Sequence, residues 1–115
     1  MNRPEIESQN LSRICNEMLI LSALAGGEKH GYQLAVDIEE KSDGFFRFNH
    51  GTLYPILHKL EKEKLIEGVW MRESPKRKRK RYALTPKGRR YRKALLEGWR
   101  EFARRFSEMI GGKGG

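Results

Sequence analysis

The side chains in this sequence best suited to chemistry are cations, and the positive excess lies in one segment. Residues 72–93 contain twelve lysines and arginines against a single acid, Glu73, while the whole chain has a net charge of +9. Six of these cations are consecutive, from Lys76 to Arg81. A positive field confined to one segment is typical of a surface that binds a polyanion. We expect this polyanion to be nucleic acid, in preference to an anionic membrane surface.

Catalytic and metal chemistry have little support in the sequence. The three histidines, His30, His50 and His58, have no metal-ligand spacing with one another or with Cys15. The sequence contains no nucleophile motif, phosphate-binding loop or dinucleotide fingerprint. Cys15 lies in an apolar stretch, where a buried, inert thiol is expected rather than a redox switch. We therefore predict a protein that is not an enzyme and holds no metal and no cofactor.

The length and hydropathy of the chain limit its class. Its 115 residues correspond to one small domain. Its longest apolar run is only Met18 to Leu21, whereas crossing a membrane takes roughly 18 residues. No secretory leader pattern opens the sequence, so we expect a cytoplasmic protein without a membrane partner. Hydrophobic residues make up only 37% of the chain, which suggests that a second copy supplies part of the core.

The cations and histidines must be positioned by regular secondary structure. The spacing of apolar residues predicts where the helices lie. Steps of three and four residues indicate helices over residues 11–25, 31–41 and 86–110. The first of these ends at Gly26-Gly27. Thr85-Pro86 is a typical cap and first residue for the last.

A further helix precedes the cationic segment and ends near residue 64. Proline is tolerated in the first turn of a helix, so Pro55 places the start of this helix at Gly51 or Thr52. Three phenylalanines in the connection before it are expected to anchor that connection in the core: Phe45, Phe46 and Phe48.

Two strands are predicted between this helix and the last one. Residues 65–73 and 79–85 are rich in β-favouring side chains and form an antiparallel hairpin around a basic turn at residues 74–78. The order helix–helix–helix–strand–strand–helix is that of a winged helix-turn-helix. We predict a mainly α fold with a small β-hairpin. It divides into a DNA-binding domain over residues 8–85, a C-terminal dimerisation helix over 86–110 and a flexible tail over 111–115.

Three motifs on these elements resemble one family. His30-Gly31-Tyr32 heads the second helix, Gly51-Thr52-Leu53-Tyr54-Pro55 opens the third, and residues 79–88 run from the second strand into the last helix. Together with Leu60-Glu61, Leu65-Ile66 and Trp70, these motifs strongly resemble the PadR-like transcriptional regulators over roughly residues 11–105. The single C-terminal helix resembles that of the short subgroup of this family.

The resemblance implies a winged-helix repressor that dimerises through its C-terminal helix and binds a palindromic operator in double-stranded DNA. Many members are released from DNA by phenolic or planar aromatic compounds. This sequence departs from the family at the wing turn, where many members have glycine. Here Pro75 is followed by the six consecutive cations, which suggests an unusually strong contact with the DNA backbone.

The candidate DNA-binding residues lie on the third helix, the hairpin and the start of the second helix. Small residues at the start of the third helix allow close approach to DNA, and its hydroxyl, imidazole and ammonium groups donate to bases or phosphates. Tyr32 either donates to a phosphate or lies at the edge of the core. The helix residues are Gly51, Thr52, Tyr54, Pro55, His58, Lys59 and Lys62, and the hairpin residues are Lys76, Arg77, Lys78, Arg79 and Lys80.

The last helix is predicted to bind a second copy of the chain, because it is too long for so small a domain to cover. Trp99 and Phe102 of the two copies would also frame a pocket for a planar aromatic effector, unless the interface is closed. The predicted interface is an apolar stripe of Tyr91, Leu95, Trp99, Phe102, Phe106 and Met109.

Other readings of the cationic segment remain open. A small basic RNA-binding protein would explain the charge but not the third helix, and we expect no aromatic stacking platform on an exposed strand. A pure interaction module would leave the charge without a role. A basic run of this length also occurs in nuclear import signals and membrane-surface patches, although these favour a tail over a hairpin.

Overall fold

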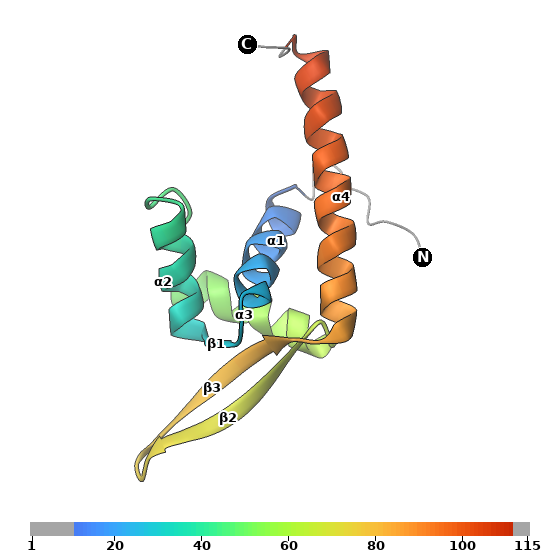
Figure 1. Cartoon of the computed structure of the whole chain (residues 1–115). Helices are drawn as coiled ribbons and strands as arrows, with labels where there is room; N and C mark the ends of the chain where they lie inside the picture. The colour runs from blue at the N-terminus through green and yellow to red at the C-terminus, as the bar shows by residue number, and fades with distance from the viewer. Residues whose placement is uncertain (1–10, 112–115) are drawn as a thin grey trace.

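The computed structural model describes residues 11–111 and has a winged-helix fold with one long additional helix (Figure 1). The first three residues of the predicted DNA-binding domain, 8–10, and most of the predicted tail, 112–115, lie outside the described residues. The elements in chain order are α1 (Leu11–Ala25), β1 (Lys29–His30), α2 (Gly31–Lys41), α3 (His50–Lys62), β2 (Ile66–Ser74), β3 (Arg77–Leu84) and α4 (Pro86–Met109).

Helix α1 lies at the centre of the core and is buried on most sides, as its wide apolar stripe predicts. Its residues Ile20, Leu21 and Leu24 are completely or almost completely buried. Around α1 pack single apolar faces of the other elements, which supply Leu34 from α2, Leu53, Leu57 and Leu60 from α3, Ile66 from β2, Tyr82 from β3 and Leu95 from α4.

Strands β2 and β3 form the predicted hairpin, the wing, but the sheet has a third strand that we did not predict. The two-residue strand β1 pairs with β3, where His30 lies opposite Arg81, so the sheet order is β1-β3-β2. Two residues are too few to show the alternation by which strands are recognised. Strand β1 joins the wing directly to the start of α2.

The wing turn is shorter than predicted. Strand β3 begins at Arg77, so only Pro75 and Lys76 lie between the two strands. The pairing shifts at Glu73: Arg72 lies opposite Lys78, whereas Ser74 lies opposite Arg77. Consecutive cations did not prevent pairing, because successive side chains of a strand point to opposite faces.

Helix α3 begins at His50, before the predicted start. The side chain of Asn49 caps it by accepting a hydrogen bond from the Thr52 amide at 2.9 Å. Pro55 therefore lies beyond the first turn, and its missing amide leaves the carbonyl of Gly51 without its usual helical donor. Gly51 is exposed, so this carbonyl remains accessible to solvent.

The connection between α2 and α3 is not anchored as predicted. Phe48 packs against the core, but Phe45 is 81% exposed and Phe46 is also exposed. Positive φ angles at Asp43 (52°) and Gly44 (80°) turn the chain sharply after α2. This turn carries the two phenylalanines away from the core, where their rings pack edge to face on each other at 4.9 Å.

Helix α4 begins with the predicted cap and starts in close contact with Lys64 and Leu65, the residues just before β2. The hydroxyl of Thr85 accepts from the Gly88 amide at 2.9 Å and donates to the Lys64 carbonyl at 2.6 Å. A Cβ on Gly88 would lie 1.9 Å from the carbonyl oxygen of Leu65, so only glycine fits there. The first half of α4 packs on α1, and the second half extends away from the body (Figure 1).

Candidate nucleic-acid interface

Helix α3 turns its apolar residues inward and its polar residues outward, as the spacing predicts. Leu53, Leu57 and Leu60 are buried in the core. The predicted DNA-binding residues on the opposite face are all exposed: Gly51, Thr52, Pro55, His58, Lys59 and Lys62. This face is therefore available to a partner along the whole helix.

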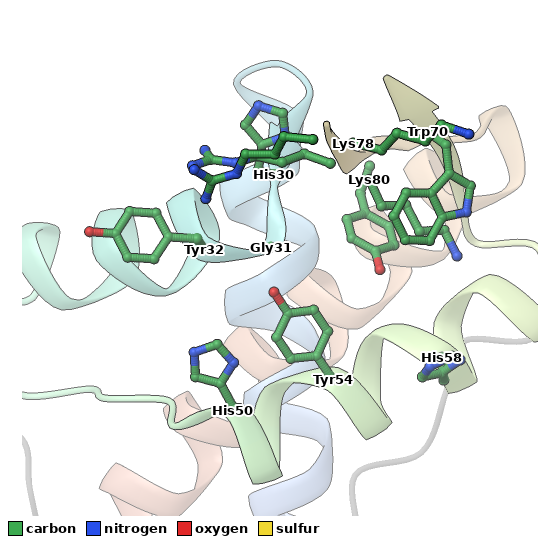
Figure 2. Close-up of a pocket in the computed structure, with 12 residues that line it drawn as sticks. His30, Gly31, Tyr32, His50, Tyr54, His58, Trp70, Lys78 and Lys80 are labelled. Carbon is green, nitrogen blue, oxygen red and sulfur yellow. The ribbon is translucent and has the colours of Figure 1, made fainter. Parts of the chain in front are cut away.

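A groove of about 660 Å³ separates this helix from the wing (Figure 2). The start of α2 closes one end of it, so three predicted parts of the DNA-binding surface meet at one concavity. Its lining combines imidazole, phenol and indole rings with four cations. The lining residues are His30, Gly31, Tyr32, His50, Tyr54, His58, Trp70, Tyr82 and Arg77 to Lys80.

Two of the family motifs, the one at the start of α2 and the one that opens α3, contact each other at the end of this groove. A Cβ on Gly31 would lie 2.7 Å from the Tyr54 hydroxyl, so glycine at this position makes room for the tyrosine ring. Figure 2 shows the Tyr54 hydroxyl pointing toward Gly31. Tyr54 is half-buried and stacks on His50, whereas Tyr32 is exposed. The structure therefore does not support a core-edge position for Tyr32.

Within the run of six consecutive cations, only the three nearest the tip of the wing are unpaired in the described part of the chain. Among residues 11–111, Lys76, Arg77 and Lys78 are exposed and form no ion pair. The other three consecutive cations are partly buried and paired across elements: Arg79 with Glu73 at 3.2 Å, Lys80 with Glu61 at 2.8 Å and Arg81 with Glu28 at 3.1 Å. Arg79 and Lys80, both predicted to contact phosphate, thus each have a carboxylate partner in the free chain, and their contact with DNA stays a prediction.

Lys80 acts as a brace between the wing and α3. Its Nζ bonds Glu61 near the end of α3 and lies 5.8 Å from the centre of the Trp70 ring and 5.5 Å from that of Tyr82. Gly68 provides the space, because a Cβ there would lie 2.5 Å from Cε of Lys80. Burial, with the nearby charge of Glu61, raises the pKa of Tyr82 to about 12. We call this contact the Glu61–Lys80 brace.

Lys59 was predicted to contact phosphate, but it pairs with acids. Its Nζ lies 3.1 Å from Glu17 of α1 and 3.3 Å from Glu63. Burial lowers the pKa of Lys59, but the hydrogen bonds and charges of the two carboxylates outweigh burial and leave the pKa above its ordinary value. Lys59 therefore neutralises an acid that is only 1% exposed.

The buried Glu17 joins three helices and was missed in the sequence. It accepts hydrogen bonds from Lys59 of α3, from the Tyr91 hydroxyl of α4 at 3.0 Å, and from Arg13 of α1 at 3.3 Å. Burial and the charge of Glu17 raise the pKa of Tyr91 to about 12. An acid within the apolar stripe of the first helix was the signal that could have revealed it.

His30 holds the single acid of the cationic segment. It is buried, its Nε2 lies 3.1 Å from Glu73, and its backbone amide donates to Gln33 at 3.1 Å. Glu73 also pairs with Arg79, so these groups tie the outer part of the wing to the start of α2. The sequence did not predict this contact, because it depends on the pairing of β1 with β3.

Two residues of the predicted dimer stripe belong to the core of the single chain. Leu95 is completely buried, and Tyr91 is half-buried against Glu17, because the first half of α4 packs on α1. Leu95 has no exposed surface to offer a partner, so we correct this part of the prediction, whereas the place of Tyr91 in the interface stays a prediction. The rings of Trp99, Phe102 and Phe106 stack in sequence along the helix at 5.7 and 5.8 Å.

Beyond Trp99 and Phe102, which are half-buried, the stripe is open to solvent. Phe106 is exposed, Met109 is 86% exposed, and Ile110 continues the same open end. The unpartnered part of this stripe therefore lies in the second half of α4.

Metal and membrane chemistry find no support in residues 11–111. The described part of the chain contains no group of three side chains that could hold a metal ion. None of its helices is both long enough and apolar enough to span a bilayer. Burial raises the pKa of the half-buried Cys15 thiol, which keeps the thiol protonated at neutral pH.

The fold and the groove define a winged-helix protein with a cationic wing tip. Residues 20–94, more than half of the chain, match the model of the transcriptional regulator PadR-like family. The chain belongs to this family, which confirms the resemblance stated from its motifs. Family members are transcriptional regulators.

Known proteins of similar length support this assignment. The protein named transcriptional regulator Rv3488 of Mycobacterium tuberculosis is 34% identical over 105 residues, covering 91% of this chain and 92% of that protein. A transcriptional regulator from Clostridium thermocellum has a TM-score of 0.80 at 28% identity, covering 88% of this chain and 98% of that one.

The structure of Bacillus subtilis PadR in complex with operator DNA is also similar. It has a TM-score of 0.66 at 30% identity, with 70% of this chain covered. The match covers only 46% of that longer chain, so the similarity concerns part of it.

Proposed function

We propose that this protein is a sequence-specific DNA-binding transcriptional regulator that acts as a repressor. The observation that carries the proposal is the groove, where Tyr54 and His58 of α3 and the unpaired cations Arg77 and Lys78 of the wing line a common space. In a helix-turn-helix, the second helix of the motif enters the major groove and reads base edges. Here that helix is α3, with Thr52 and His58 as donors to bases.

The wing supplies the sequence-independent part of binding. Lys76, Arg77 and Lys78 are free to neutralise phosphates, and contacts of this kind dominate the affinity of proteins for DNA. The B. subtilis PadR complex with operator DNA supports double-stranded DNA as the partner. Trp70 is a single exposed ring on a strand, which is less than the two or three rings of an RNA-stacking sheet.

A homodimer on a palindromic operator completes the proposal. The exposed apolar end of α4 suits a second copy of the chain, and two copies related by a two-fold axis would present two recognition helices. Their spacing must be about 34 Å to enter successive major grooves.

A planar aromatic effector is the regulatory part of the proposal. The stacked rings of Trp99 and Phe102 provide a flat apolar wall near the proposed two-fold axis. An aromatic molecule bound there should quench tryptophan fluorescence, and a Trp99→Phe variant should lose most of this quenching while Trp70→Phe keeps it. Absence of both quenching and binding heat for a panel of planar aromatics would favour a closed interface.

The test of DNA recognition compares two duplexes at one salt concentration. One carries the sequence immediately upstream of the coding region of this protein, and the other carries the same bases in scrambled order. We expect tighter binding to the first, and Thr52→Ala or His58→Ala should reduce the difference between the two. Equal affinity of the unaltered protein for both duplexes and for a panel of further upstream regions would contradict sequence-specific binding.

A further inference from the structure

Trp70 is an exposed side chain of the groove to which the proposed function assigns no role. It is 63% exposed on β2 and lines the groove together with His58 and Lys78. Figure 2 shows its indole on the wing side of the groove, with His58 on α3 below it. A ligand that enters the groove between α3 and the wing therefore meets this ring.

The ring is held from behind by the Glu61–Lys80 brace. Lys80 lies directly opposite Trp70 in the strand register, and its ammonium approaches the indole and bonds Glu61 at 2.8 Å. Gly68, two residues before Trp70, leaves room for the lysine stem. A ring fixed in this way loses little side-chain entropy when a partner covers it.

Charge around the ring indicates what should cover it. Glu61 neutralises Lys80, so the surface at the indole is apolar and close to neutral. The unpaired cations Arg77 and Lys78 lie farther along the same strand toward the tip. A nucleic-acid strand has a matching pattern, since apolar sugar faces alternate with phosphates along its backbone.

We propose that Trp70 packs its indole against a deoxyribose of the DNA strand that runs between α3 and the wing, while Lys78 binds an adjacent phosphate. Lys80 is a positioning residue that holds the indole in this orientation. The inference rests on the proposed DNA-binding function and adds a contact that carries no charge.

Because the Trp70 contact involves no charge, it can be distinguished from the phosphate contacts of the wing. Trp70→Ala should weaken binding to the upstream duplex and to a scrambled duplex by about tenfold each, because the lost contact is apolar area. The dependence of affinity on salt concentration should stay the same, since no phosphate contact is lost. Fluorescence titration gives a second readout: DNA should quench the unaltered protein strongly and the Trp70→Phe variant weakly.

Val69→Ala is the matched control. Val69 is the neighbouring residue on β2, is 51% exposed, and points to the opposite face of the strand. The Val69→Ala variant should bind both duplexes with the affinity of the unaltered protein. Circular dichroism and thermal unfolding of each variant establish that the fold is retained.

Lys80 is tested through its coupling to Trp70. Lys80→Gln should weaken DNA binding by a smaller factor than Trp70→Ala, and Lys80→Arg should restore most of it. In the Trp70→Ala background, Lys80→Gln should cause a clearly smaller loss than in the unaltered protein, because the brace then has no ring to hold. A loss of the same size in both backgrounds would contradict the positioning role.

The outcomes separate this inference from the proposed function. Unchanged affinity of Trp70→Ala would overturn the inference and leave the proposed function intact. A flatter salt dependence for Trp70→Ala, or an equal loss in Val69→Ala, would also overturn it, because the wing as a whole would then be disturbed. If the unaltered protein bound neither duplex, the proposed function itself would fail.

Discussion

Glu17 shows how a single residue fixes the arrangement around the recognition helix. Its carboxylate is almost completely buried and accepts from Lys59, Tyr91 and Arg13, which belong to α3, α4 and α1. A buried acid is tolerated only when it is paired and hydrogen-bonded. The helix proposed to contact DNA and the helix proposed to dimerise therefore share one carboxylate.

Two tyrosines that lie close to acids, Tyr82 near Glu61 and Tyr91 near Glu17, predict an alkaline limit of stability. The pKa values of Tyr82 and Tyr91 are raised to about 12 in the folded protein, against an ordinary value of 10. A raised pKa contributes stability that is complete below pH 10 and is lost as the pH rises through 12. Lys59, whose pKa is also raised, acts in the same direction.

We therefore expect the free energy of unfolding to fall between pH 10 and pH 12, and to fall less in Tyr91→Phe, which has one such hydroxyl fewer. Denaturant titrations across this window, with tyrosinate absorbance as a second signal, measure both effects. Stability that stays constant through the window would show that these hydroxyls ionise as they do in the unfolded chain.

The pairing of the wing cations predicts which of them set the salt dependence of DNA binding. Replacing Lys76, Arg77 and Lys78 together by glutamine should flatten the slope of log affinity against log salt by roughly 0.9 per lost phosphate contact. Arg81→Gln is the matched control, because Arg81 is on the same strand but is paired with Glu28. Its slope should stay near that of the unaltered protein. Flattening by roughly 0.9 in Arg81→Gln would mean that the ion pair with Glu28 opens on DNA.

At the level of elements, the close approach of α4 to the connection between α3 and β2 depends on Gly88. Gly88→Ala would improve helix propensity by up to about 1 kcal/mol, yet its Cβ would lie 1.9 Å from the Leu65 carbonyl oxygen. Overpacking of this kind typically costs about 1–3 kcal/mol, so we expect net destabilisation in urea unfolding. Gly26→Ala is the control, because its Cβ would make only an ordinary contact at 3.8 Å. A stabilised Gly88→Ala variant would show that α4 can move away from Leu65 at no cost in stability.

The helices that pack on the core were predictable from sequence because apolar periodicity reports burial directly. The same periodicity placed α1, α2 and the start of α4 correctly. Strand β1 was too short for any pattern, and α3 began earlier than Pro55 suggested because Asn49 supplies a cap. The exposed Phe45 follows from backbone angles at Asp43 and Gly44, which hydrophobicity does not encode.

The groove itself was harder to predict, because its chemistry depends on pairs far apart in sequence. The exposed face of α3 followed from helical spacing. The partners of Lys59 and Lys80 are 42 and 19 residues away and are set by the packing of α1, α3 and the wing. The run of consecutive cations therefore predicted a positively charged surface, but not which of the cations remain without an ion pair.

For the whole molecule, the second half of α4 predicts self-association that can be separated from folding. Phe106→Ser with Met109→Ser removes side chains that are exposed in the single chain, so it should dissociate the dimer without opening the core. Sedimentation at micromolar concentration should then show the monomer, with the circular dichroism of a folded chain. Leu95→Ala is the contrasting variant, because its buried side chain should cost about 2–5 kcal/mol of folding stability. A stable monomer of the unaltered protein would refute the predicted dimer.

The wing and the far half of α4 leave the body in opposite directions (Figure 1), and this separation has a genetic consequence. A chain with a neutralised wing tip but an intact α4 would still pair with unaltered chains and give mixed dimers with one competent half. Such an allele should be dominant over the unaltered gene in a reporter strain that expresses both. An allele with Phe106→Ser and Met109→Ser should be recessive, because its product cannot capture unaltered partners.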